Sequence, residues 1–236
     1  MLYLVLDYIF FGNGESKERI KVHSMKLIHI GCGYKPIKGF TNYDSNVFLF
    51  FKYVPFSEKF LSLFKFIPKP FIEFITIAKK YNILYCDASK RICEQDDTID
   101  IIYSCHMLEH FDWKESTIFL NESYRVLKKG GILRIVVPDF DYLVNKYNDN
   151  KNIDNFIDSS CLVGKKPKTL IKKIQYLLQG HGWHHQMFAS NSIEKFSQFK
   201  FKKVLECNPG YTNIKLNTQI DLCERQIGSL YFEFIK

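Results

Sequence analysis

Four short apolar runs, each ended or followed by glycine or a polar residue, constrain this chain more than any other feature. The runs lie at residues 26–30, 40–44, 82–87 and 98–105. Short apolar runs bounded by turn residues are typical of buried strands. Stretches with helical or polar patterns separate them. This alternation predicts an α/β fold with a mainly parallel sheet joined by right-handed crossovers.

The second half of the chain continues the alternation of helices and strands. Apolar residues over 113–128 follow an approximate helical spacing, and lysines followed by Gly130 and Gly131 are the expected end of that helix. A continuous apolar run predicts a strand over 132–137. Further predicted elements are helices over 139–147, with Asp139 as its N-cap, and over 191–199, and strands over 202–207 and 229–235.

Glycines and carboxylates stand at the ends of the first three predicted strands. In sheets of this kind, ligands bind beyond the carboxyl ends of the strands. Gly31 and Gly33, with Cys32 between them, let the backbone turn tightly and approach a ligand. The turn matches neither GxGxxG, because residue 36 is Pro, nor a P-loop. Asp44 and Asp87 can accept hydrogen bonds from ribose hydroxyls or an amino group, or can instead cap a helix.

A histidine-rich motif follows the fourth strand. His106, Glu109 and His110 form an HxxEH pattern directly after Ser104 and Cys105. On a helix, HxxEH is the pattern of inverted zinc peptidases. No third ligand is evident, and we predict no metal ligands. The alternatives are a zinc hydrolase, a cation held by His106 or Glu109 that binds a diol acceptor, and a purely structural polar pair of Glu109 and His110.

The charge and the aromatic content point to an acidic or apolar partner. The 236 residues carry a net charge of +8 and include 22 Phe, and aromatic residues make up 16%. Much of both excesses lies in residues 46–80, and further lysines cluster over 165–173. Residues 46–80 fit a helical lid over an acceptor, a hydrophobic dimer contact or an amphipathic segment on an anionic membrane surface. The lysine cluster fits a solvated face or a grip on phosphate or membrane.

The apolar runs and the cysteines narrow the cellular context. No apolar run of about 18 residues occurs, which argues against a transmembrane helix. The seven cysteines include no CxxC pair, and several lie in apolar runs. That pattern predicts reduced, buried thiols in a cytoplasmic protein, which a membrane-binding segment would bring to the inner face of the membrane.

Four fragments of the chain resemble one known family. They are HIGCGYKPIKGFTNYD, IDIIYSCHMLEHF, YRVLKKGGILRIVVPD and the terminal GSLYFEFIK. In this order they resemble class I S-adenosylmethionine-dependent methyltransferases, more narrowly the small type 11 enzymes associated with surface-polysaccharide biosynthesis. The resemblance implies a Rossmann-like, mainly parallel seven-stranded sheet with an antiparallel last strand and helices on both faces. It implies one domain over 25–236, an extension over 1–24, and insertions at about 46–80 and 148–182.

The resemblance also implies roles for individual residues toward S-adenosyl-L-methionine. The loop that packs against the methionine part of the cofactor matches Gly31, Cys32 and Gly33, the ribose-binding acid matches Asp44, and the adenine contact matches Asp87 and Ala88. The loop that faces both cofactor and acceptor matches Ser104, Cys105 and His106. These matches lie at the strand ends that the residue pattern selects.

Two histidines are candidates for the catalytic base. His106 is the better placed, because an imidazole titrates near neutral pH and can take a proton from a hydroxyl as the methyl carbon is attacked. The resemblance places His184 near the acceptor pocket, although the adjacent His185 also fits, since neighbours in an extended segment point to opposite sides.

We therefore expect O-methylation of a sugar or other small-molecule hydroxyl in surface-glycan biosynthesis. An acceptor that carries a phosphate would suit the positive charge. The alternatives are a non-catalytic membrane- or partner-binding module on the same fold, a zinc hydrolase and an RNA methyltransferase. The RNA alternative ranks below the glycan one, because the sequence has no added RNA-binding domain and no basic aromatic platform of the kind that binds RNA.

Overall fold

The computed structural model describes residues 25–63, 69–163, 183–214 and 225–236. The predicted extension over 1–24 and the lysine cluster over 165–173 lie outside these ranges.

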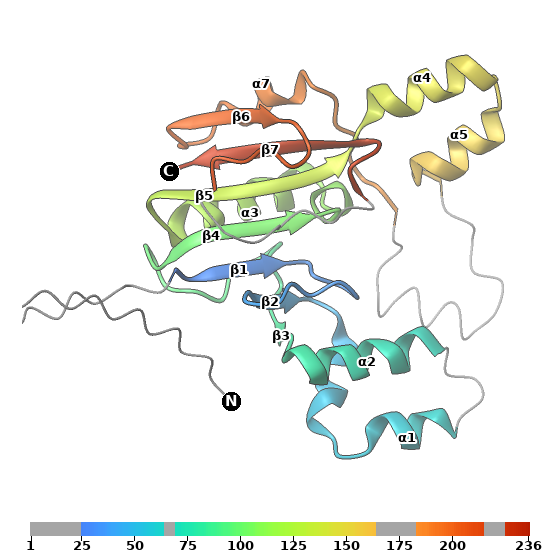
Figure 1. Ribbon diagram of the computed structural model, residues 1–236, viewed down its shortest axis with the longest axis vertical. Coiled ribbons are helices and arrows are strands. Elements are labelled where there is room, and N and C mark those ends of the chain that lie inside the picture. Colours follow the sequence, from blue (N-terminus) through green and yellow to red (C-terminus); the bar gives the residue numbers. More distant parts are fainter. Residues whose placement is uncertain (1–24, 64–68, 164–182, 215–224) are drawn as a thin grey trace, which may run out of the picture.

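A seven-stranded sheet forms the centre of the molecule, with helices packed around it (Figure 1). Its order is β3-β2-β1-β4-β5-β7-β6. The strands are β1 (Leu27–Ile30), β2 (Thr41–Asp44), β3 (Leu84–Tyr85), β4 (Ile99–Cys105), β5 (Leu127–Pro138), β6 (Lys203–Cys207) and β7 (Ser229–Ile235). Strand β7 runs antiparallel to β5 and β6, and the other pairs are parallel. The predicted Rossmann-like fold is confirmed, including the antiparallel last strand.

The central strands are buried because both faces of the sheet are covered. β4 and the second half of β5 are almost entirely buried, as their continuous apolar sequences predict. Helix α3 (Trp113–Val126) begins at a capping box, in which Asp112 accepts from the backbone N–H of Glu115 and Glu115 accepts from that of Asp112. Its buried face, which includes Phe119 and Leu120, belongs to the main core.

The predicted end of this helix is wrong. Helix α3 stops at Val126, and Leu127 already pairs with Ile99 as the first residue of β5. The next pair is Ile101 with Ile132, so residues 128–131 form an irregularity within the strand. Gly130 has a φ of +81°, which favours glycine. The burial of Leu127 and its pairing across the sheet override the local stop signal of lysines and glycines.

Helical elements occupy most of residues 46–80. They are η1 (Val47–Tyr53), α1 (Ser57–Ser62) and α2 (Lys69–Tyr81). Helix α2 leads into β3 and buries one face that includes Phe71 and Phe74. Figure 1 shows α1 and α2 beyond the edge strand β3, toward the side to which the parallel strands point.

A second helical pair follows β5. Asp139 caps α4 (Phe140–Asn150) by accepting from the backbone N–H groups of Asp141 and Tyr142, as predicted. Helix α5 (Ile153–Ser160) packs against α4, and α7 (Ser192–Phe196) lies near β6. Within the described ranges, every helix is too short or too polar to cross a bilayer.

Candidate active site

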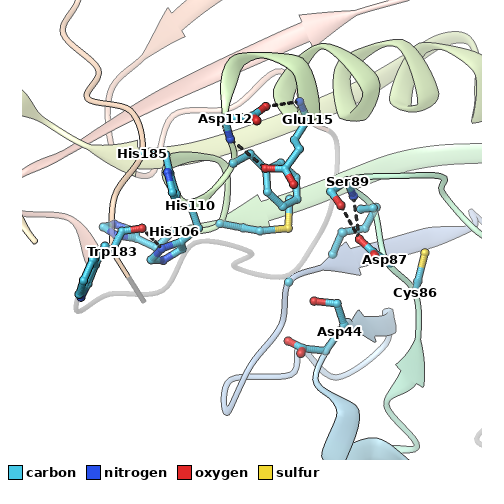
Figure 2. A pocket seen from close by; sticks show the side chains of 16 residues that line it. Asp44, Cys86, Asp87, Ser89, His106, His110, Asp112, Glu115, Trp183 and His185 are labelled. Carbon is cyan, nitrogen blue, oxygen red and sulfur yellow. Dashed lines mark hydrogen bonds between the residues drawn. The ribbon is translucent and has the colours of Figure 1, made fainter. Parts of the chain in front are cut away.

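A pocket of about 610 Å³ opens at the carboxyl ends of the parallel strands. Residues that follow β1, β2, β3 and β4 line it, and residues around 183–185 close one side. Figure 2 shows two walls, one with Asp44 and Asp87, the other with His106, His110 and Trp183. The volume is in the range of sites for small ligands and cofactors.

The glycine turn after β1 is held close to the neighbouring strand. The backbone N–H groups of Gly31 and Cys32 both donate to the carbonyl of Tyr43 on β2. Gly31 has a φ of +72°, and a Cβ there would lie 2.6 Å from the sulfur of Met107. Only glycine fits this position without displacing Met107, and Gly31 lines the pocket.

Asp44 ties the end of β2 to the glycine turn. Its Oδ2 accepts the backbone N–H of Gly33 at 2.8 Å, and its Oδ1 accepts that of Asn46 at 2.8 Å. Burial raises the pKa of Asp44 above its usual value, against the lowering effect of these backbone hydrogen bonds. Asp44 also lines the pocket, and an ionised carboxylate can accept more hydrogen bonds than these two.

Asp87 follows β3 and forms the same wall. Its Oδ1 accepts from the hydroxyl of Ser89 at 2.6 Å, and its Oδ2 pairs with Lys90 at 2.8 Å. Burial raises the pKa of Asp87, but the hydrogen bonds from Lys90 and Ser89 outweigh this and hold it below the usual value. The predicted neighbour Ala88 is buried and also lines the pocket.

The remaining predicted cofactor residues lie behind this pocket or beside it. Cys32, Gly33 and Cys105 line a neighbouring cavity of about 250 Å³, which Gly31 and His106 share with the main pocket. Ser104 is fully buried, and its hydroxyl faces the sulfur of Met107 at 3.8 Å.

The cysteines that the structure describes are free thiols. Cys86 lines the pocket, and burial raises the pKa of its thiol to about 12. The prediction of buried thiols is confirmed for Cys32, Cys86 and Cys105, whereas Cys161 and Cys207 are half-buried and Cys93 is exposed.

His106 sits at the junction of the two cavities in a left-handed conformation, with φ of +52°. Its Nε2 lies 3.0 Å from the hydroxyl of Ser229, and its Nδ1 lies 3.3 Å from Oε1 of Glu109. Residues 108–110 form the short 3-10 helix η2 (Leu108–His110). The HxxEH residues therefore do not share one α-helix, as the peptidase alternative required.

The segment after residue 182 packs directly on η2. The backbone N–H groups of His185 and Gln186 donate to the carbonyl of Glu109, and Nδ1 of His110 lies 3.1 Å from the carbonyl of Trp183. Trp183 and His185 line the pocket, whereas His184 points to Glu109, with 3.9 Å between Nε2 and Oε1. Burial lowers the pKa of His184.

Sequence reasoning missed part of the lining. Met107 and the capping-box pair Asp112 and Glu115 line the pocket, although their local patterns indicate only a helix start. A capping box is a strong structural signal and does not distinguish a helix that also borders a ligand site.

Part of the chain is similar to a known family. Residues 69–135 match a profile described as a methyltransferase domain. A search of curated proteins found no match.

Solved structures similar to the chain include three methyltransferases. A Thermotoga maritima protein described as an S-adenosylmethionine-dependent methyltransferase, possibly acting on histamine, is 15% identical over 92% of this chain and 84% of its own, with a TM-score of 0.47. An Archaeoglobus fulgidus S-adenosylmethionine-dependent methyltransferase is 14% identical over 91% and 87%, with a TM-score of 0.47. A putative methyltransferase of Haloferax volcanii, solved with the Trm112 activator, is 13% identical over 89% and 82%, with a TM-score of 0.48.

The sheet order, the antiparallel strand β7 and the pocket at the strand ends are those of a Rossmann-like fold with a ligand site at the carboxyl ends of its strands. The methyltransferase-domain profile matches residues 69–135, less than half of the chain, and points to S-adenosylmethionine as the cofactor to compare with the pocket. The pocket suits this cofactor, because its wall joins a glycine turn without a Cβ to two carboxylates that can accept from hydroxyl and amino groups.

Proposed function

We propose that the protein is a methyltransferase that moves the methyl group of S-adenosylmethionine to a hydroxyl of a small molecule, with His106 as the base. The observation that carries this proposal is the position of the His106 ring. It borders the pocket, and Nε2 already lies 3.0 Å from a hydroxyl, that of Ser229. With Glu109 facing Nδ1, a proton on Nδ1 leaves Nε2 as the acceptor.

In this reaction the residues of the chain would hold the cofactor and accept a proton from the acceptor. S-adenosylmethionine, when bound, supplies a methyl group on a sulfonium, which departs as a neutral thioether. The acceptor oxygen forms the bond to the methyl carbon as the carbon–sulfur bond breaks, and His106 takes the hydroxyl proton on Nε2. Gly31, Asp44 and Asp87 would hold the cofactor, and Glu109 would orient the His106 ring.

The base is tested by His106→Ala and His106→Gln in the purified enzyme. Proton transfer to a positioned base is worth roughly 100- to 10,000-fold. We expect kcat to fall by at least 100-fold in both variants, while the affinity for S-adenosylmethionine stays within twofold. Unchanged kcat in both variants would remove His106 from the proposal. Cofactor binding without turnover on any acceptor would favour a non-catalytic module.

We propose a sugar, or another intermediate of a surface glycan, as the acceptor. The support is the resemblance of the sequence fragments to type 11 enzymes associated with polysaccharide biosynthesis, and the positive charge suits an acceptor that carries phosphate. A panel of sugars, nucleotide sugars and lipid-linked sugars with methyl-labelled cofactor tests this. Labelling confined to amines or to RNA would overturn the assignment.

We also propose that residues 47–63 contact an anionic membrane surface. This segment exposes large apolar residues to solvent. Between 49% and 76% of the surface is exposed in each of Phe50, Tyr53, Val54, Phe56 and Leu63. Lysines accompany the rings, with Nζ of Lys52 4.8 Å from the ring centroid of Tyr53, and Nζ of Lys59 5.8 Å from that of Phe56. Exposed aromatic groups beside cations are typical of interfacial membrane segments.

Vesicle sedimentation tests this contact. The full-length protein should bind phosphatidylglycerol vesicles and not pure phosphatidylcholine vesicles. The double variant Tyr53→Ser, Phe56→Asn should bind at least fivefold less, whereas Tyr211→Ser should not change binding. Tyr211 is a matched control, because it is 74% exposed outside this segment. Equal vesicle binding by the wild type and the double variant would overturn the proposal. A wild-type protein that is a dimer, with a double variant that is a monomer, would also overturn it, because the segment would then be a dimer contact.

A further inference from the structure

Glu109 is the least compensated buried charge beside the pocket. Its side chain is 1% exposed, and neither carboxylate oxygen accepts a hydrogen bond from the residues that the structure describes. A buried carboxylate without hydrogen-bond donors is costly unless a cation compensates it. The groups that face it are imidazoles, namely those of His106 and His184 at 3.3 and 3.9 Å from Oε1.

Two of the surrounding histidines complete a set of metal-ligand atoms with Glu109. One ligand atom each from Glu109, His110 and His184 lie within 4.8 Å of one another. A tetrahedral ion with bonds of about 2.1 Å separates its ligands by roughly 3.4 Å, so small side-chain rotations close the site. The rings of His110 and His184 are set edge to face, with centroids 5.2 Å apart.

The tautomer of His110 suits a ligand role. Its Nδ1 lies 3.1 Å from the carbonyl of Trp183. A carbonyl only accepts, so Nδ1 carries the proton and Nε2 keeps its lone pair. Histidines that bind metals commonly donate their other N–H to a backbone carbonyl in this way.

Backbone contacts bring the third ligand into place. The N–H groups of His185 and Gln186 donate to the carbonyl of Glu109 at 2.7 and 3.2 Å, and the N–H of His184 donates to the carbonyl of Cys161 at 3.0 Å. The first two bonds hold residues 185 and 186 against η2, and the third holds His184 against Cys161. The set therefore combines ligands 74 residues apart in the chain, and the HxxEH motif contributes only part of it.

We propose that Glu109, His110 and His184 bind one divalent transition-metal ion beside the cofactor pocket. Two imidazoles and a carboxylate suit zinc and its first-row neighbours better than magnesium. Three protein ligands leave a coordination position open, as in catalytic sites. His110 also lines the pocket, so that position is suited to an acceptor oxygen. This last role rests on the proposed O-methylation, whereas metal binding itself does not.

Metal binding is tested on the full-length protein, with any polyhistidine tag removed and bound metal stripped. Titration with Zn²⁺ and Co²⁺ should show one equivalent bound, and the Co²⁺ spectrum should lack a thiolate charge-transfer band. Glu109→Gln and His184→Asn should each weaken binding at least tenfold. His185→Asn should bind like the wild type, because His185 is the neighbour outside the set.

The folded state of each variant is checked by its affinity for S-adenosylmethionine. No stoichiometric binding by the wild type, binding of Mg²⁺ only, or equal binding by the wild type, Glu109→Gln and His184→Asn would overturn the metal site. If Glu109→Gln fails to fold, His110→Asn replaces it, and unchanged binding there counts equally against the site. A wild-type protein that binds the metal ion but transfers no methyl group to any acceptor would instead count against the proposed function.

Discussion

Oδ2 of Asp44 accepts the backbone N–H of Gly33 at 2.8 Å, which joins the end of β2 to the turn that follows β1. The bond fixes the relative position of two strand ends that are predicted separately as cofactor contacts. The carbonyl of Tyr43, one residue earlier, accepts from Gly31 and Cys32 and strengthens the same junction. These bonds hold one wall of the pocket together.

Replacing Gly31 should disrupt the cofactor site. Gly31→Ala places a Cβ within 2.6 Å of the Met107 sulfur and strains a backbone at φ of +72°. We expect the affinity for S-adenosylmethionine, measured by calorimetry, to fall at least tenfold. Gly39→Ala is the control, because Gly39 has a φ of +89° with open space around it. Equal affinity in both variants would mean that the contact with Met107 does not matter.

Cofactor affinity should weaken at acidic pH through Asp44. Burial raises the pKa of Asp44 above its ordinary 3.8, and protonation converts an acceptor oxygen into a donor. As pH falls through this raised pKa, the dissociation constant for S-adenosylmethionine should increase. Asp44→Asn should bind weakly at all pH values and lose this dependence. Asp87→Asn should retain it, because the pKa of Asp87 is lowered and that group stays ionised longer.

His29 should make stability fall with acidification. Burial lowers the pKa of His29 from 6.5 to about 4, against a hydrogen bond with the Asn42 side chain that raises it. Between these values the unfolded chain binds a proton that the folded chain does not. The free energy of unfolding should therefore drop by about 3 kcal/mol as pH falls from near 7 to near 4.

Denaturant unfolding over that range measures the effect of His29. His29→Phe keeps a ring against Tyr103, whose centroid lies 5.1 Å away, and should reduce the pH dependence by that amount. The same change at the exposed His185 is the control and should leave the dependence unchanged. Parallel pH profiles for the wild type and His29→Phe would contradict the prediction.

The buried ion pair between β5 and β7 should be a major determinant of stability. Nη1 of Arg134 lies 2.8 Å from Oε1 of Glu233, and both side chains are fully buried. Thr212 and Asn213 also donate to Glu233. Glu233→Ala leaves a buried guanidinium uncompensated and should cost about 3–5 kcal/mol in urea unfolding.

A partly exposed pair provides the comparison for Glu233. Glu58 and Lys79 lie 2.6 Å apart, with side chains 24% and 28% exposed. Glu58→Ala should cost about 1 kcal/mol or less, because solvent screens this pair. Similar costs for the two substitutions would show that burial does not set the strength of the Arg134–Glu233 pair.

Local patterns determined the strands and the positions of their polar ends. Each strand is a short apolar run that must be buried, and its end is marked by a residue that a strand interior excludes, such as Gly31, Asp44 or Asp87. Since parallel strands end at one edge of the sheet, these residues had to converge. The pocket wall that we assign to the cofactor was therefore predictable from short-range information.

Only the tertiary structure decided the acceptor side. Leu127 reads as the end of a helix, but pairing with Ile99 makes it a strand residue. Nothing local distinguishes His184 from His185. In the structure, the backbone of His185 bonds to the carbonyl of Glu109, the ring of His184 faces the buried Glu109 carboxylate, and the side chain of His185 lines the pocket. These arrangements depend on contacts between residues far apart in the chain, and a sequence window does not contain the free energy that selects them.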